Sequence, residues 1–212
     1  MAKEENRGLN WPGKDGSPVP RTNHLLVIGI DDYQHHRPLN NARRDAETFR
    51  DLMLNRYQFE SANVYGLFDQ DATRRNIIAA LEALEQRLTE RDSLLIYFSG
   101  HGTMNRRQTQ GFWVPVDAGN EGTADYLANT RVRDILADMQ VHHLYLIVDA
   151  CFAGTMIVRK SENAHLELSE ANPSRRVLSS GRQEVVSDGK PGEHSPFFTC
   201  LQHQLTQSLS TP

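Results

Sequence analysis

Short apolar runs alternate along the chain with segments of helical periodicity, and this alternation most constrains the fold. Four runs are nearly all apolar: HLLVIGI (24–30), NVYGLF (63–68), SLLIYF (93–98) and HLYLIV (143–148). Helical spacing of apolar residues marks four other segments, 41–56, 73–88, 130–139 and 196–209. Strands buried on both faces and separated by helices are typical of parallel sheets. We therefore expect a three-layer α/β fold, with helices on both faces of a mostly parallel central sheet.

Smaller features complete this expectation. Thr73 and Thr130 stand where N-caps belong, so each is expected to cap its helix. The segment GFWVPV (111–116) predicts a short edge or hairpin strand, limited by Pro115. RRVLSS and QEVVSD, between 175 and 188, predict one or two more strands. Cys200 follows two phenylalanines in the last helix, and we expect it in the core.

The composition favours one soluble domain in the cytoplasm. The 212 residues carry a net charge of −4, too small to favour nucleic acid or an anionic membrane as the main partner. No apolar run approaches the roughly 20 residues that span a bilayer. The polar N-terminus has no signal-peptide pattern, and two cysteines, Cys151 and Cys200, give no disulfide framework. We expect neither a membrane nor a nucleic-acid partner.

The domain boundaries follow from local composition. Residues 1–22 are rich in proline, glycine and charge and predict a disordered arm. One domain is expected over 23–212, with a polar linker at 159–175 between a larger part (23–158) and a smaller part (176–212). We find no metal-ligand spacing and no contiguous loop of acidic oxygen ligands, so neither a metal nor another cofactor is expected.

Reactive side chains follow two of the predicted strands. The third run ends in Ser99-Gly100-His101-Gly102 and the fourth in Asp149-Ala150-Cys151. Because the carboxyl ends of neighbouring parallel strands lie together, we expect His101 close to Cys151. A thiol with a histidine beside it is the minimum for nucleophilic catalysis. The N–H groups of Gly102 and Cys151 could together hold an oxyanion.

Each motif alone has a simpler interpretation. A cysteine at a strand end is usually part of the core, and a histidine before a glycine is more often a turn residue. The two motifs together, separated by a crossover that contains a helix, favour catalysis.

These motifs resemble those of caspases. The caspase signature Gln-Ala-Cys-x-Gly has its histidine about 50 residues upstream, and here 151 − 101 = 50. Asp149 replaces the glutamine and the glycine falls one place later, at Gly154, which matches the metacaspase branch and its prokaryotic orthocaspase relatives. LVIGIDDY, PLNNARRDA and the segment from 179 to about 205 resemble the family's first strand, first helix and small subunit. The resemblance covers about residues 24–209 and implies a caspase-like fold and a cysteine endopeptidase.

The resemblance also implies a substrate, a polypeptide with arginine or lysine at P1, the residue before the cleaved bond. A pocket for a basic side chain needs carboxylates. The metacaspase residues that line it correspond to Asp45, Ser99 and Asp149 here. Ala42 stands where many metacaspases have cysteine, which predicts a looser wall. Asp31 and Asp32 could also face the site, and the sequence leaves that open.

The mechanism that we expect is a dyad, Cys151 as nucleophile and His101 as acid and base, because no third member is evident. Self-cleavage is predicted in the linker, at Arg159-Lys160 or Arg175-Arg176. Some metacaspases need Ca²⁺, so activation by Ca²⁺ stays open.

The last helix ends earlier than a complete caspase small subunit would, which predicts a sensing or targeting domain outside this chain. Two alternatives remain: a caspase-like scaffold with little catalysis, and a protease with acidic P1 preference.

Overall fold

The computed structural model describes residues 11–12, 18–19, 21–57, 59–105, 110–151, 174–181 and 187–207. The helices in this part of the chain are α1 (Ala42–Arg56), α2 (Arg74–Arg87), α3 (Asn129–Asp138) and α4 (Pro196–Gln207), with the 3₁₀ turns η1 (Ser61–Asn63) and η2 (Asp69–Asp71). The strands are β1 (Trp11–Pro12), β2 (Pro18–Val19), β3 (Thr22–Gly29), β4 (Val64–Phe68), β5 (Asp92–Ser99), β6 (Gly102–Asn105), β7 (Gln110–Trp113), β8 (Leu127–Ala128), β9 (His143–Asp149) and β10 (Ser174–Ser179).

The central sheet is parallel throughout its described strands, in the order β10-β9-β5-β3-β4. The chain enters this sheet at β3, moves outward to the edge strand β4, and then crosses to β5 on the other side of β3. Such a reversal of direction leaves a crevice at the carboxyl ends of the strands, where ligands bind in open α/β sheets. The register pairs Ser99 with Asp149, so the ends of β5 and β9 lie side by side, as predicted.

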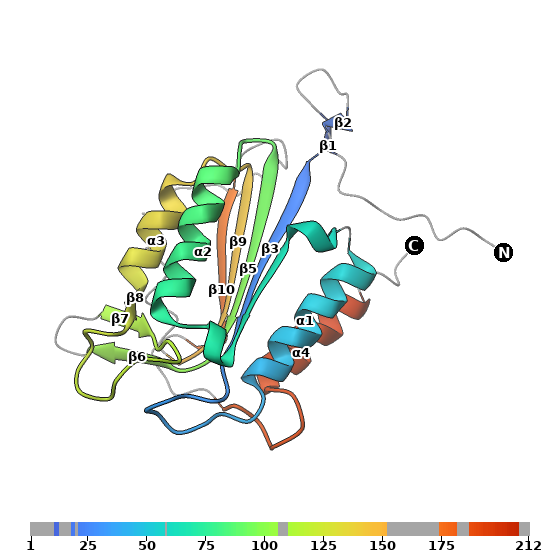
Figure 1. Ribbon diagram of the computed structural model, residues 1–212. Coiled ribbons are helices and arrows are strands. Elements are labelled where there is room, and N and C mark those ends of the chain that lie inside the picture. The colour runs from blue at the N-terminus through green and yellow to red at the C-terminus, as the bar shows by residue number, and fades with distance from the viewer. Residues whose placement is uncertain are drawn as a thin grey trace, which may run out of the picture.

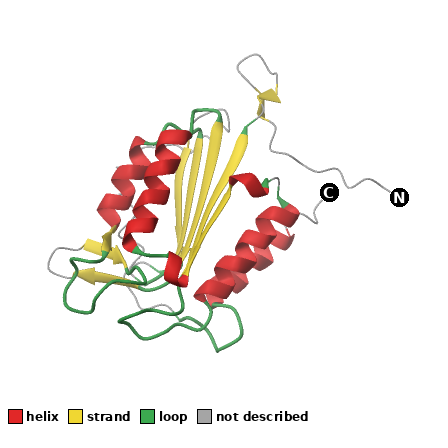
Figure 2. Ribbon diagram, in the orientation of Figure 1, coloured by secondary structure: helices red, strands yellow, loops and turns green. Residues whose placement is uncertain are grey.

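The helices form the outer layers of the fold. Figure 1 shows α2 and α3 on one face of the sheet and α1 and α4 on the other, and Figure 2 shows the three layers. Alternate strand residues serve the two faces: Leu26, Ile96 and Leu146 pack on the α2 side, whereas Leu25, Tyr97 and Ile147 pack on the α1 side. This two-sided burial explains why the strands are nearly all apolar. The predicted three-layer α/β architecture is confirmed.

A second, antiparallel sheet continues from the end of β5. Its strand order is β6-β7-β8, and Gly102 at the start of β6 faces Trp113 in β7. The predicted strand at 111–116 is therefore the middle strand β7, which ends before Pro115. The sequence analysis missed β6 because GTMN carries no apolar alternation.

Some local expectations hold and others fail. Thr73 caps α2, because its Oγ1 accepts a hydrogen bond from Asn76 N at 3.1 Å. Thr130 does not cap α3, which begins one residue before it, after Ala128. Cys200 is exposed rather than buried, because α4 turns Phe198 toward the sheet and Cys200 away from it.

Several predictions concern segments that the structure does not describe. Of the two predicted strands after residue 174, RRVLSS falls largely in β10, whereas most of QEVVSD lies outside the described residues. The predicted arm and most of the linker also lie outside them, apart from the short antiparallel pair of β1 and β2. Within the described residues, no helix is long and apolar enough to cross a membrane.

Candidate active site

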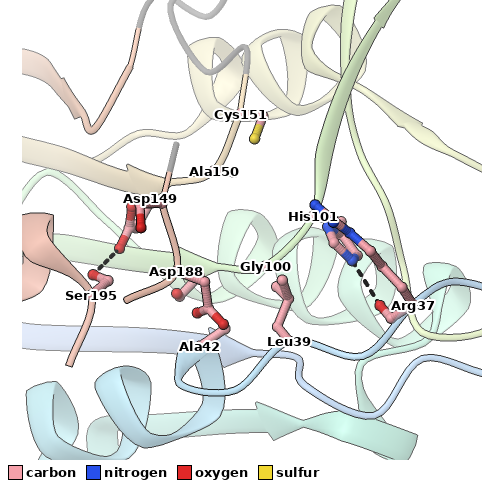
Figure 3. Close-up of a pocket in the computed structure, with 12 residues that line it drawn as sticks. Arg37, Leu39, Ala42, Gly100, His101, Asp149, Ala150, Cys151, Asp188 and Ser195 are labelled. Atoms are coloured by element: carbon pink, nitrogen blue, oxygen red, sulfur yellow. Dashed lines mark hydrogen bonds between the residues drawn. The ribbon is translucent and has the colours of Figure 1, made fainter. Parts of the chain in front are cut away.

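A cavity of about 210 Å³ opens at the carboxyl ends of β5 and β9. His101 and Cys151, which follow these strands, both line it (Figure 3). Ser99 and Asp149 at the strand ends line it as well. Gly100 and Ala150, the residues directly after β5 and β9, line it as well. The remaining lining residues come from the loop before α1, from the start of α1, and from the segment before α4: Arg37, Leu39, Ala42, Ser187, Asp188 and Ser195. The predicted meeting of the histidine and cysteine motifs is therefore present.

The imidazole of His101 is held by a backbone carbonyl. Its Nε2 lies 2.9 Å from the carbonyl oxygen of Arg37, in the loop between β3 and α1 (Figure 3). Since a carbonyl only accepts, Nε2 carries the proton and Nδ1 is left with its lone pair. Burial lowers the pKa of His101, an effect that the Arg37 carbonyl partly opposes. A third element thus supports the predicted pair, and the sequence could not reveal it because it is a main-chain atom.

Gly102 brings the histidine motif against the cysteine motif. A Cβ at this position would lie 2.1 Å from the carbonyl oxygen of Cys151, which no side chain tolerates. Glycine is therefore required by close approach of two backbones, and its φ is not in the positive range. Gly102 itself is not among the residues that line the cavity.

Cys151 follows β9 after one intervening residue, in a turn. Its side chain is partly exposed, and neither it nor Cys200 is in a disulfide. A thiol at the rim of a cavity is reachable by a substrate, unlike a cysteine that only fills the core.

Asp149 is a buried carboxyl group that faces the same cavity. It is 7% exposed, and its Oδ2 accepts a hydrogen bond of 2.6 Å from the hydroxyl of Ser195 (Figure 3). Burial raises its pKa to about 6, while the hydrogen bond from Ser195 acts in the opposite direction. Ser99 lies beside it on the neighbouring strand β5 and is also buried.

Asp45 lies in α1 and is fully buried, and it does not line the cavity. One oxygen, Oδ1, is 2.5 Å from Nδ1 of His194, and the other accepts the backbone N–H of Ser195 at 3.1 Å. Burial raises the pKa of Asp45, and both partners oppose that effect. Ser195 thus links two carboxyl groups, since its N–H binds Asp45 and its hydroxyl binds Asp149.

Asp188 is a further acid at the cavity, contributed by the segment before α4. Asn40 holds its Oδ2 through the backbone N–H at 2.6 Å and through Nδ2 at 3.2 Å. The buried Asn41 fixes the main chain there, because its Nδ2 donates to the carbonyls of Asp188 and Lys190. Both hydrogen bonds from Asn40 end on Oδ2 of the Asp188 carboxyl group.

The site thus gathers most of the predicted residues but not all. His101, Cys151, Ser99 and Asp149 line one cavity, and Ala42 lines it too, whereas Asp45 does not. Asp31 and Asp32 do not line it either; their backbone N–H groups bind Asp69 instead. The sequence analysis missed Asp188 and Ser195. Ser195 could have been found from the pair Ser195-Pro196, a helix start signal that predicts an N-cap.

Comparisons with known proteins agree with this architecture. The family model described as Caspase domain matches residues 22–211. Metacaspase-1 of Arabidopsis thaliana is 27% identical over 161 residues, which cover 69% of this chain and 43% of that protein. Metacaspase-1 of Plasmodium falciparum is 28% identical over 151 residues, covering 62% and 24% respectively. The chain thus spans less than half the length of these curated relatives.

A solved structure shares the fold. A crystal structure of a protein from Geobacter sulfurreducens superposes with a TM-score of 0.52 at 21% sequence identity, covering 62% of this chain and 51% of that one. The family model extends over nearly the whole domain, from the start of β3 to beyond α4. The chain therefore belongs to the caspase-domain family of peptidases, and its similarity to curated proteins lies with metacaspases.

Proposed function

We propose that the protein is a cysteine endopeptidase that cleaves polypeptides after arginine or lysine. The observation that carries this proposal is the composition of one cavity, which combines His101 and Cys151 with the carboxyl groups of Asp149 and Asp188. A nucleophile and a proton carrier supply the reaction, and two acids supply a complement for a cation.

The reaction uses groups of the protein itself. Nδ1 of His101 first takes the proton of the Cys151 thiol. The thiolate then attacks the carbonyl carbon of the bond to be cleaved, and a tetrahedral oxyanion forms. His101 gives a proton to the leaving amine as the C–N bond breaks, which leaves a thioester on Cys151. His101 then takes a proton from water, whose oxygen attacks the thioester, and the C–S bond breaks to release the carboxylate.

The surroundings of His101 suit this exchange. Because Nε2 donates to the Arg37 carbonyl, the lone pair of Nδ1 is the one that takes and returns the proton. The N–H groups of Gly102 and Cys151 are proposed to stabilise the oxyanion, and the contact between their backbones supports this pairing.

Preference for a basic P1 residue follows from the charges at the cavity. Asp149 and Asp188 line it, whereas the cation among the lining residues is Arg37, whose side chain is exposed. An aspartate at P1 would place a third carboxylate near two others, which is unfavourable in a partly buried site. Asp45 is proposed to act behind the cavity, by fixing Ser195 and through it Asp149.

Self-cleavage is proposed at Arg159-Lys160, which lies outside the described residues. The other predicted site, Arg175-Arg176, lies in β10, where Arg175 pairs with Leu144 of β9 and its guanidinium donates to the carbonyl of Met139. A protease needs a segment that can enter its cavity as an extended chain. Arg175 and Arg176 are exposed, but β10 is paired with β9 and is therefore not free to move into the cavity. Mass spectrometry of the purified chain locates the cut. A cut at 175–176 would contradict this choice.

The test is a panel of fluorogenic peptides that differ only in P1: Arg, Lys, Asp and the neutral arginine analogue citrulline. Wild type is measured with and without Ca²⁺, beside Cys151→Ala and His101→Ala. We expect kcat/KM for Arg and Lys to exceed that for Asp by about a hundredfold or more, and both variants to lose activity. Equal cleavage after Asp would overturn the specificity, and full activity of Cys151→Ala would overturn the mechanism. Wild type inert toward every peptide, with or without Ca²⁺, would instead support the scaffold alternative.

A further inference from the structure

The loop between β3 and α1, residues 30–41, contacts His101 at more than the Arg37 carbonyl. The hydroxyl of Tyr33 accepts a hydrogen bond of 2.7 Å from the backbone N–H of His101. The Tyr33 ring also packs against the imidazole, with ring centroids 4.7 Å apart. The same loop thus fixes the main chain, one ring face and Nε2 of the histidine.

Gly100 makes room for this contact. A Cβ at Gly100 would lie 2.7 Å from the Tyr33 hydroxyl oxygen, closer than such atoms approach in proteins. The two glycines that flank His101 therefore have separate reasons: Gly100 admits the tyrosine hydroxyl, and Gly102 admits the Cys151 backbone. Close contacts on both sides of His101 thus explain why the SGHG motif has glycine at both positions.

The loop is itself anchored, which a positioning element requires. The backbone N–H groups of Asp31 and Asp32 donate to Oδ1 of the buried Asp69, at 2.8 and 3.1 Å. Farther along, Gln34 N donates to the carbonyl of Val116 at 3.0 Å. Tyr33 lies between these attachments, so its hydroxyl is held at a defined place relative to the sheet.

We propose that Tyr33 is a positioning residue of the catalytic histidine, with its hydroxyl fixing the His101 backbone and its ring fixing the imidazole so that Nε2 meets the Arg37 carbonyl. The inference rests on the catalytic role proposed for His101. Tyr33 does not line the cavity, so it acts through His101 and not by touching the substrate. Burial raises the pKa of Tyr33 well above its usual range, which keeps the hydroxyl neutral at working pH.

The first test compares Tyr33→Phe with Tyr57→Phe. Tyr57 is a matched control, because its hydroxyl also hydrogen-bonds to main chain, the Leu205 carbonyl at 3.0 Å, on the α1–α4 side and outside the cavity lining. Removing the Tyr33 hydroxyl leaves the His101 N–H without its acceptor, so we expect kcat for the Arg peptide to fall on the order of tenfold with KM unchanged. Tyr57→Phe is expected to keep both values. Equal kcat in Tyr33→Phe and wild type would overturn the proposal.

The second readout needs no peptide substrate. Alkylation of Cys151 by iodoacetamide is followed across pH in a Cys200→Ser background, because Cys200 is exposed and would react as well. A mispositioned imidazole supports the thiolate less, so Tyr33→Phe is expected to shift the half-maximal rate to higher pH. Tyr57→Phe should leave the profile in place. A profile unchanged by Tyr33→Phe would contradict the positioning role even if kcat had fallen.

The third test uses the space at Gly100. Gly100→Ala should clash with the Tyr33 hydroxyl and lower kcat more than Tyr33→Phe does. The double variant Tyr33→Phe/Gly100→Ala removes the clashing oxygen, so we expect it to be more active than Gly100→Ala alone. Losses that simply multiply would show that the two positions do not interact and would overturn the proposal. Failure of the proposed function looks different, because wild type would then lack peptidase activity that depends on Cys151.

Discussion

The two sides of the cavity are built in different ways. The acid side, Asp149, Asp188 and Ser195 with Asp45 behind them, brings together charged groups from three distant segments, and burial raises the pKa of Asp149 to about 6. The histidine side holds His101 through one loop, mainly by neutral hydrogen bonds to the main chain. Under the proposed function, substrate recognition is therefore electrostatic and sensitive to pH, whereas the histidine is held in place by neutral hydrogen bonds to the main chain.

Asp149→Asn should separate the two sides most strongly. It removes a buried charge of the cavity and keeps the shape of the side chain, so we expect kcat/KM for the Arg peptide to fall about a hundredfold. Cleavage of the citrulline peptide should change far less, because that substrate needs no charge partner. Tyr33→Phe should instead slow both peptides by the same factor. We test this by measuring kcat/KM of both variants on the Arg and citrulline peptides. An equal loss on both peptides in Asp149→Asn would contradict a separate role of the acid side in recognition.

Asp188→Asn should have a smaller effect of the same kind. Asp188 is only half-buried, and Asn40 already engages its Oδ2, so we expect a loss of about tenfold for Arg at P1, mostly in KM. An asparagine at position 188 can keep the contact with Asn40, so we expect the variant to fold normally. A thermal melt that matches wild type checks this. A change in kcat with constant KM would contradict a role in substrate binding and would indicate that Asp188 acts in the chemical step.

The pH dependence of selectivity should report Asp149 directly. Its pKa in the folded protein is raised to about 6, so the carboxylate is lost as pH falls through that value. The ratio of kcat/KM for Arg over citrulline should therefore fall roughly three- to fivefold between pH 7.5 and 5.5. The ratio cancels the titration of Cys151 and His101, which both substrates share. A flat ratio would contradict the role of Asp149.

Measurements of stability should distinguish Asp149 from Asp45. A carboxyl whose folded-state pKa is raised loses stability as pH rises between its unfolded and folded values, so ionised Asp149 destabilises the fold above about pH 6. Asp149→Asn should raise the free energy of unfolding by about 1 kcal/mol at pH 7.5. His194→Ala, which removes a partner of the buried Asp45, should lower it by about 2 kcal/mol. Urea titrations measure both, and a stabilising His194→Ala would contradict the structural role of that pair.

The sequence predicts the layers of the fold, because apolar patterns mark the strands and helices. It also predicts the meeting of His101 with Cys151, because each residue closely follows a predicted strand and neighbouring parallel strands bring their carboxyl ends together. It does not predict the Arg37 carbonyl, since a main-chain atom leaves no residue signature. Asp188 and Ser195 reach the cavity only through the path of the chain before α4, which local patterns do not encode. Cys200 was assigned to the core from its apolar neighbours, although the helix turns it outward.

The most direct test of the account is covalent labelling of Cys151 by peptidyl chloromethyl ketones that carry Arg or Asp at P1. The thiolate displaces chloride only when P1 occupies its pocket, so intact mass and peptide mapping read nucleophile and specificity together. We expect the Arg reagent to label Cys151 at least about tenfold faster than the Asp reagent, and Asp149→Asn to remove the difference. Faster labelling by the Asp reagent, or an adduct at Cys200 with none at Cys151, would contradict it.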